Sequence, residues 1–229
     1  MTKLLDAIEI ETGKNPSAAV IWMHGLGADG NDFVPIVPEL GLPRSPAIRF
    51  VFPHAPMRPV TINNGYVMRA WYDVSLGDLE GKTRQADEKG VRESEAQIRA
   101  LIERESQRGI APSQIVLAGF SQGGAIALQT GLRHPEPLAG VLALSAYLPL
   151  AETLPQEASA ANRKTPIFMA HGTYDPVVPY AMGSASRVYL SGLGYGIDWH
   201  DYPMQHSVCA EEITAVGAWL RRVLASGKR

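Results

Sequence analysis

The sequence has few of the features that mark membrane-spanning, secreted or nucleic-acid-binding proteins. Its single cysteine, Cys209, cannot form a disulfide within the chain and has no Cys or His companions at metal-ligand spacing. No stretch approaches the roughly 18 apolar residues that a membrane span needs. The 21 Lys and Arg residues nearly balance the 23 Asp and Glu residues and form no basic cluster of the kind that binds nucleic acid. We therefore expect no metal, no stable membrane insertion and no nucleic-acid partner.

The first residues also lack the uninterrupted apolar core of a signal peptide. In MTKLLDAIEIETG the apolar residues are interrupted by Asp6, Glu9 and Glu11. Hydrophobic residues make up 45% of the chain, which is enough to build a substantial core. These properties predict a cytoplasmic globular protein in which residues 1–229 form one domain.

Near-continuous apolar runs alternate along the chain with segments of helical periodicity. The runs are AAVIWM, which ends at Met23, and those at 48–52, 114–120, 138–145, 165–170 and 197–202. Runs without polar alternation are typical of strands that are covered on both faces of a parallel sheet. The alternation of strands and helices predicts an α/β fold with a mostly parallel central sheet and helices on both faces.

One long segment, from about 55 to 87, shows little periodicity but carries bulky side chains. Loops of this length inside a compact domain are usually functional, so we expect this one to border the substrate. Met68, Trp71 and Tyr72 are its candidate substrate-binding residues. For Trp71 and Tyr72 a second interpretation fits as well, in which both are core aromatics that anchor the loop.

The stretch HGLGADG carries Gly25, Gly27 and Gly30 in the G-x-G-x-x-G spacing of dinucleotide-binding loops. That mechanism requires a helix that begins at the loop and an acidic residue about 20 positions later. Pro35 and Pro38 permit at most a short or interrupted helix, and the later sequence RSPAIRFVF contains no acid. The sequence therefore argues against a dinucleotide site.

The sequence GFSQGG places Ser121 between a predicted strand and a predicted helix. In this setting G-x-S-x-G makes a turn so sharp that the serine is strained and exposed, and only small residues fit at the positions of Gly119 and Gly123. We therefore interpret Ser121 as a nucleophile. Cys209, near the start of the last helix, is a weaker alternative, since a small buried thiol is the more usual explanation.

A serine nucleophile needs a base and an acid, which follow it in the order acid, then histidine. Four histidines follow Ser121, at positions 134, 171, 200 and 206. Of these, His206 lies in the loop between the last strand and the last helix, which suits a base. Asp175, just past the run TPIFMA, is the predicted acid. Asp198 and Asp201 are its rivals, although both lie within the final strand region and close to His206 in sequence.

The developing oxyanion requires backbone N–H donors. One comes from the residue after the nucleophile, Gln122, and the other from a loop after an early strand, where HGLG stands.

Five motifs together resemble the carboxylesterase/phospholipase family of α/β-hydrolases, which includes the acyl-protein thioesterases. They are HGLGADGNDF, FPHAPMRPVTINNGYVMRAWYD, AGFSQGGAIAL, HGTYDPVVP and YPMQHSV, and the block ending in WYD is especially similar to bacterial carboxylesterases. The resemblance implies an α/β-hydrolase fold, a triad of Ser121, Asp175 and His206, and an oxyanion hole made by the N–H groups of Leu26 and Gln122. It also implies an acyl channel beside residues 55–80 and a homodimer. Gln205 departs from the family, which more often has glycine before the histidine.

These observations predict a serine carboxylesterase that cleaves carboxylic esters of small to medium acyl chains and needs no cofactor. An acyl-protein thioesterase or a lysophospholipase is the alternative within enzymes, because oxoesters and thioesters share the same tetrahedral chemistry. A non-catalytic binding protein of the same fold is a further alternative. The complete triad argues against it.

Overall fold

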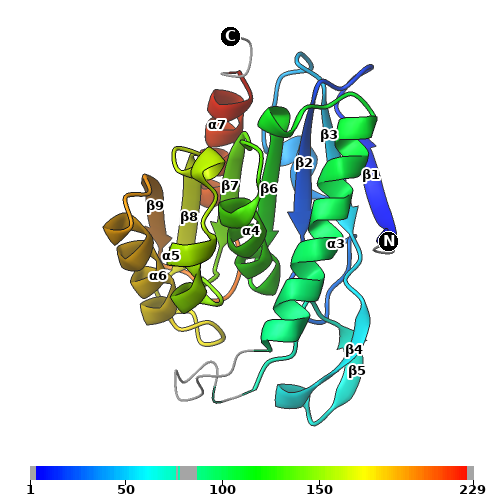
Figure 1. Ribbon diagram of the computed structural model, residues 1–229. Helices are drawn as coiled ribbons and strands as arrows, with labels where there is room; N and C mark the ends of the chain where they lie inside the picture. Colours follow the sequence, from blue (N-terminus) through cyan, green and yellow to red (C-terminus); the bar gives the residue numbers. More distant parts are fainter. Residues whose placement is uncertain (1–3, 76, 78–86, 226–229) are drawn as a thin grey trace.

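A seven-stranded sheet forms the centre of the computed structural model, which describes residues 4–75, 77 and 87–225 (Figure 1). The strand order is β1-β3-β2-β6-β7-β8-β9, and every neighbouring pair is parallel except β1 with β3. The strands are β1 (Ala7–Glu11), β2 (Ala18–Met23), β3 (Ile48–Pro53), β6 (Ile115–Phe120), β7 (Gly140–Leu144), β8 (Ile167–Gly172) and β9 (Ile197–Tyr202).

Helices cover both faces of the sheet, as Figure 1 shows for the helices in front of it and for α7 behind it. One face carries α3 (Glu88–Gln107), α4 (Gln122–Arg133), α5 (Leu154–Glu157) and α6 (Tyr180–Gly192). The other carries α1 (Ile36–Glu39) and α7 (Ala210–Ala225). Single 3-10 turns lie at Thr61–Asn63, Pro112–Gln114, Ala151–Thr153 and Ala160–Asn162.

The predicted fold class is confirmed: the sheet is mostly parallel and has helices on both faces. Each of the six predicted runs forms a strand, and β2, β3, β7 and β8 are buried along their whole length. Strand β1 was not predicted from the sequence. Its alternating residues AIEIE are only partly buried at the edge of the sheet. An edge strand that pairs on one side gives a weaker apolar signal than a central strand.

The expectation of an irregular loop over 55–87 is wrong for its first part. Met57–Val60 (β4) and Tyr66–Arg69 (β5) pair as an antiparallel hairpin, closed by a turn in which Asn64 and Gly65 have φ of 55° and 77°. The hairpin is largely exposed, so its residues show no regular burial pattern. Residues 76 and 78–86 of the predicted loop lie outside the described residues.

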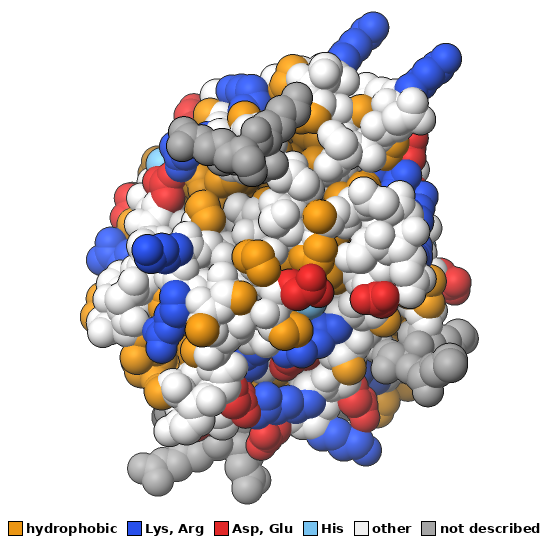
Figure 2. Space-filling view, turned by 45° about the horizontal axis from the view of Figure 1, so that its top comes forward, with side chains coloured by type: hydrophobic (Ala, Val, Ile, Leu, Met, Phe, Trp, Pro, Cys, Tyr) orange, Lys and Arg blue, Asp and Glu red, His pale blue; other side chains and the backbone are white. Residues whose placement is uncertain are grey.

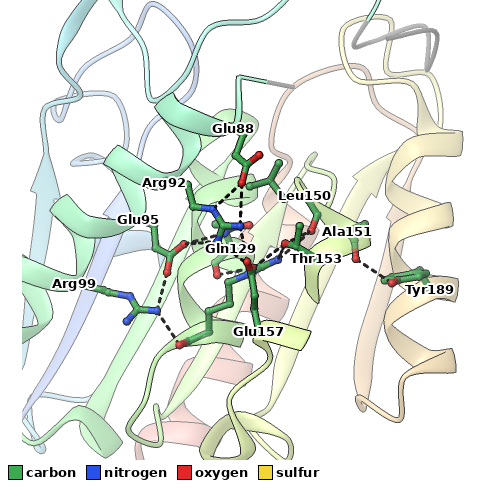
Figure 3. A network of polar contacts seen from close by, with 11 residues as sticks. Glu88, Arg92, Glu95, Arg99, Gln129, Leu150, Ala151, Thr153, Glu157 and Tyr189 are labelled. Atoms are coloured by element: carbon green, nitrogen blue, oxygen red, sulfur yellow. Dashed lines mark hydrogen bonds and ion pairs between the residues drawn. The ribbon is translucent and has the colours of Figure 1, made fainter. Parts of the chain in front are cut away.

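A polar network fixes the C-terminal part of α4 to the helices beside it (Figure 3). The buried guanidinium of Arg133 contacts Glu157 at 2.6 Å and donates to the carbonyl of Leu150 at 3.0 Å. Arg92 of α3 contacts the same carboxylate at 2.5 Å. The hydrogen bond from Arg92, with further hydrogen bonds from Arg133 and Thr153, lowers the pKa of Glu157 to about 2. A lowered carboxyl pKa means that the charged form stabilises the folded state.

We expect Glu157→Gln to make stability less dependent on pH. The ionised Glu157 stabilises the fold fully above its ordinary pKa of 4.5, and this contribution is lost as the pH falls toward about 2. Urea unfolding at pH 7 should therefore show a loss of about 1 kcal/mol in the variant, allowing for partial exposure of the carboxylate. The loss should shrink at pH 3. Glu152→Gln, an exposed position nearby, is the control, and an equal loss at both pH values for Glu157→Gln would contradict the role of the charge.

Candidate active site

The turn between β6 and α4 holds Ser121 in a strained conformation, with φ of 55° and ψ of −122°. Small neighbours make this turn possible. A Cβ on Gly123 would lie 2.7 Å from the carbonyl oxygen of His24 and closer still to that of Met23. A Cβ on Gly119 would lie 2.6 Å from the nitrogen of Gly124. The sequence argument for G-x-S-x-G thus has a direct steric basis here.

Asp175 and His206 form a close pair. The distance from Asp175 Oδ2 to His206 Nδ1 is 2.7 Å, and the Asp175 side chain is completely buried. The other carboxylate oxygen accepts the backbone N–H groups of Val177 and Val178, both at 2.9 Å. These bonds fix the direction of the carboxylate, so that Nδ1 of His206 carries the proton and Nε2 is left as the acceptor.

Ser121 and His206 lie on adjoining parts of the site, and no hydrogen bond joins them. The ring of Phe120, the residue before Ser121, lies 4.7 Å from the ring of His206. Within the described residues the Ser121 hydroxyl has no hydrogen-bond partner. Such contacts are often long without substrate and tighten when substrate binds.

The loop after β2 lies beside Ser121 and contains the backbone N–H of Leu26, which has no acceptor within the described residues. Gly27, at φ of 77°, donates its N–H to the carbonyl of Arg69 at 2.9 Å. The N–H groups of Leu26 and Gln122 donate to no group in the described part of the chain. Because Gly123 packs against the carbonyls of Met23 and His24, this loop and the start of α4 are in direct contact.

Two histidines anchor the same loop. The ring of His24 accepts the N–H of Ala55 at 3.1 Å, and its other nitrogen lies 2.7 Å from the carbonyl of Gly25. Burial lowers the pKa of His24 to about 4, so the ring is neutral near pH 7 and donates to that carbonyl. His54 accepts the N–H of Gly30 at 3.1 Å. Both histidines therefore have structural partners.

The side chain of Gln122 makes two hydrogen bonds to the segment of Trp71 and Tyr72 that were not predicted from the sequence. Its oxygen accepts the N–H of Trp71 at 3.1 Å, and its nitrogen donates to the carbonyl of Tyr72 at 2.8 Å. Only its backbone N–H was predicted to matter. Its position next to the nucleophile, in contact with an aromatic segment far along the chain, could not be read from one sequence.

The burial of Trp71 and Tyr72 agrees with the second interpretation, in which both are core aromatics that anchor the loop. Their exposed fractions are 0% and 1%, and the Trp71 ring nitrogen donates to the carbonyl of His24 at 2.9 Å. The Tyr72 hydroxyl donates to Tyr147 at 2.9 Å. Both residues are therefore buried and joined by hydrogen bonds to other parts of the chain, as core aromatics that anchor the loop would be. Met68 is half-buried, and its sulfur lies 3.6 Å from the place of a Cβ on Gly27.

The rival acids and bases have other partners. Asp198 contacts His200 at 3.0 Å and Arg222 at 2.7 Å. Asp201 accepts the Tyr180 hydroxyl at 2.8 Å. None of these contacts involves His206, so only Asp175 among the candidate acids is paired with it.

The remaining two histidines and the cysteine are unsuited to the chemistry. His134 is buried, which lowers its pKa to about 4. His171 is buried behind Asp175, with Nε2 2.9 Å from the carbonyl of Val178 and 3.6 Å from Asp175 Oδ2. Burial raises the pKa of the half-buried Cys209 and so disfavours the reactive thiolate.

Gln205 fits the loop that carries His206 without strain. It is not one of the residues with positive φ, so its backbone does not require glycine. Its carbonyl accepts the N–H of Ser207 at 2.9 Å, and the neighbouring Met204 carbonyl accepts the N–H of Tyr174 at 3.1 Å. The loop is thereby attached to the loop of Asp175 through a backbone hydrogen bond in addition to the contact between Asp175 and His206.

None of the described helices is both long and apolar enough to cross a membrane. Over the same residues, no three His, Cys, Asp or Glu side chains are grouped so as to hold a metal ion.

Comparison with known proteins agrees with this geometry. Residues 5–224 match the model of the phospholipase/carboxylesterase family. Acyl-protein thioesterase 1 of Gibberella zeae is 40% identical over 214 residues, which cover 91% of each chain. Acyl-protein thioesterase 1 of Neurospora crassa is 42% identical, with 89% of this chain and 86% of the relative covered.

Solved structures show the same fold. Arabidopsis thaliana SOBER1 superposes with a TM-score of 0.83 at 32% identity, and the match covers 90% of this chain and 99% of that one. Esterase PE8 superposes with a TM-score of 0.81 at 28% identity, covering 97% and 100%. The chain therefore belongs to the phospholipase/carboxylesterase family of α/β hydrolases, enzymes that act on ester bonds.

Proposed function

We propose that the protein is a serine esterase that cleaves carboxylic esters through an acyl-enzyme. The observation that carries the proposal is the 2.7 Å contact between Asp175 and His206, which lies at the same sheet edge as the strained Ser121. Asp175 orients the His206 ring. His206 Nε2 takes the proton of the Ser121 hydroxyl, and Ser121 Oγ attacks the acyl carbon.

The oxyanion that forms on the acyl group needs donors that are already in position. The unused N–H groups of Leu26 and Gln122 are the donors that we assign to it, each contributing about 3 kcal/mol to the transition state. The protonated His206 then gives its proton to the leaving oxygen or sulfur. Water, activated by the same histidine, hydrolyses the acyl-enzyme. The substrate is a small-molecule ester or thioester.

Thioester hydrolysis is the second candidate. The fungal relatives at 40% and 42% identity are named acyl-protein thioesterase 1, which supports this alternative. The arrangement around Ser121 serves both reactions, because the tetrahedral intermediate is the same apart from its leaving atom.

We expect Ser121→Ala to lower kcat for ester hydrolysis by about 10⁶, or roughly 8 kcal/mol, since triad residues act as a unit. A fluorophosphonate probe should label the wild type at Ser121 and leave the variant unlabelled. Ser145, another strand-end serine with positive φ, provides the control variant Ser145→Ala, which should keep its activity. Near-normal turnover by folded Ser121→Ala, or no labelling of the folded wild type, would exclude the proposal.

Asp175→Asn should lower kcat by about 10⁴, as in other Ser-His-Asp enzymes, because the amide favours the wrong tautomer of His206. The asparagine oxygen can still accept the N–H groups of Val177 and Val178, so the fold should persist. Asp198→Asn is the matched control, since Asp198 pairs with His200. If both variants lost activity equally, the acid would be wrongly assigned.

A series of oxoesters and thioesters of increasing acyl length should reach its highest kcat/KM at short or medium chains. Each buried CH₂ contributes about 0.8 kcal/mol until the acyl site is full, after which kcat/KM should stop rising. A maximum at long chains would instead favour the acyl-protein thioesterase or lysophospholipase alternative. Ser121→Ala, measured on the same series, gives the background.

A further inference from the structure

A cavity of about 400 Å³ adjoins His206 on the side of the sheet that α1 and α7 cover. Its walls include the rings of Phe33, Phe120 and His206. The three rings follow one another closely, with centroid distances of 5.6 Å between Phe33 and Phe120 and 4.7 Å between Phe120 and His206. A volume of this size suits a small organic group.

The position of His206 indicates which part of a substrate enters this cavity. In acylation, the bond from Ser121 Oγ to the acyl carbon forms and the bond from that carbon to the leaving oxygen or sulfur breaks. The proton taken from Ser121 passes from His206 to the leaving atom. The leaving group must therefore lie beside His206, whereas the oxyanion lies toward Leu26 and Gln122. The cavity has His206 and Phe120, the residue before Ser121, in its wall, so a leaving group that takes the proton of His206 can extend into it.

The carboxylates in the wall of the cavity have no basic side chain beside them in the lining. Two carboxylates, Asp32 and Glu39, lie among its lining residues, and no Lys or Arg does. Within the described residues neither carboxylate takes part in an ion pair or a side-chain hydrogen bond. Burial, together with the neighbouring charge of Asp29, raises the pKa of Asp32. Both residues are exposed to solvent, and a cation bound in the cavity would favour the charged form of their carboxylates.

Aromatic rings and unpaired carboxylates are together the surroundings that a substituted ammonium group prefers. A cation over an aromatic face gains about 0.5–2 kcal/mol, and nearby carboxylates add an attraction that salt weakens. We propose that this cavity is the leaving-group site and that Asp32 and Glu39 give the enzyme a preference for alcohols or thiols that carry a positive charge. The inference rests on the proposed function, since it assigns the leaving group through the role of His206.

A pair of thioesters with the same acyl group tests the proposal. One has 2-(trimethylammonio)ethanethiol as its leaving group and the other has 3,3-dimethylbutane-1-thiol, which has the same shape without the charge. Both form the same acyl-enzyme, so the ratio of their kcat/KM values reports acylation alone. We expect wild type to prefer the cationic thioester by about tenfold, corresponding to about 1.4 kcal/mol, and the ratio to fall as salt is added.

The double variant Asp32→Asn, Glu39→Gln should lower this ratio at least fivefold, because it should lower kcat/KM for the cationic thioester more than for the neutral one. Glu136→Gln with Glu152→Gln removes the same net charge elsewhere on the surface and should leave the ratio as in wild type. Tetramethylammonium ion should inhibit hydrolysis of the neutral thioester competitively in wild type and more weakly in the double variant.

Other outcomes separate the two proposals. A wild-type ratio near one, or a ratio that the double variant does not change, overturns the leaving-group site while leaving the esterase intact. Failure of folded wild type to hydrolyse either thioester or to react with a fluorophosphonate overturns the proposed function itself. Thermal unfolding of each variant shows whether it is folded.

Discussion

The close approach of three backbone segments around Ser121 is the constraint on which the site depends. The serine adopts φ of 55° because β6 turns directly into α4, and Gly123 brings the first turn of that helix against the carbonyls of Met23 and His24. Gly124 lies equally close to Ala146, just beyond β7, whose Cβ would be 2.7 Å from a Cβ at position 124. Ser121 is therefore held by its neighbours on both sides in the sheet, and the strain of its backbone is supported by buried packing.

The groups around this turn are fixed by hydrogen bonds that use neutral or backbone partners. His24 is neutral because burial lowers its pKa to about 4, and it joins the loop after β2 to Ala55. The side chain of Gln122 joins the start of α4 to Trp71 and Tyr72. Preorganised donors in a site of this kind need no rearrangement when charge develops in the transition state. On the face shown in Figure 2, acidic and basic side chains lie interspersed, with hydrophobic ones in small groups.

The sequence predicted those parts of the molecule whose signal is local. Strands such as β2 and β8, which are buried on both faces, appear as unbroken apolar runs, and the turn at Ser121 requires glycine at fixed positions. The pairing of Asp175 with His206 followed from the order of the loops at one sheet edge. The hairpin β4–β5 was not predicted because its exposed strands of four residues have no periodic pattern. Nor could the sequence show that Trp71 is buried, since burial depends on contacts such as that with His24, 47 positions away.

The two sides of the proposed site are held by different kinds of contact, and this difference affects which leaving groups the enzyme would accept. On the proposed oxyanion side, the loop after β2 is tied to Ala55 and Arg69 and packs against α4. On the proposed leaving-group side, His206 pairs with one carboxylate and adjoins a cavity lined by Asp32 and Glu39. The acyl-enzyme is common to all substrates with the same acyl group, so discrimination between leaving groups can arise only before it forms. If the proposed site is right, the residues from Asp32 to Glu39 and the loop of His206 are the places where a substitution would change the alcohol or thiol that the enzyme releases.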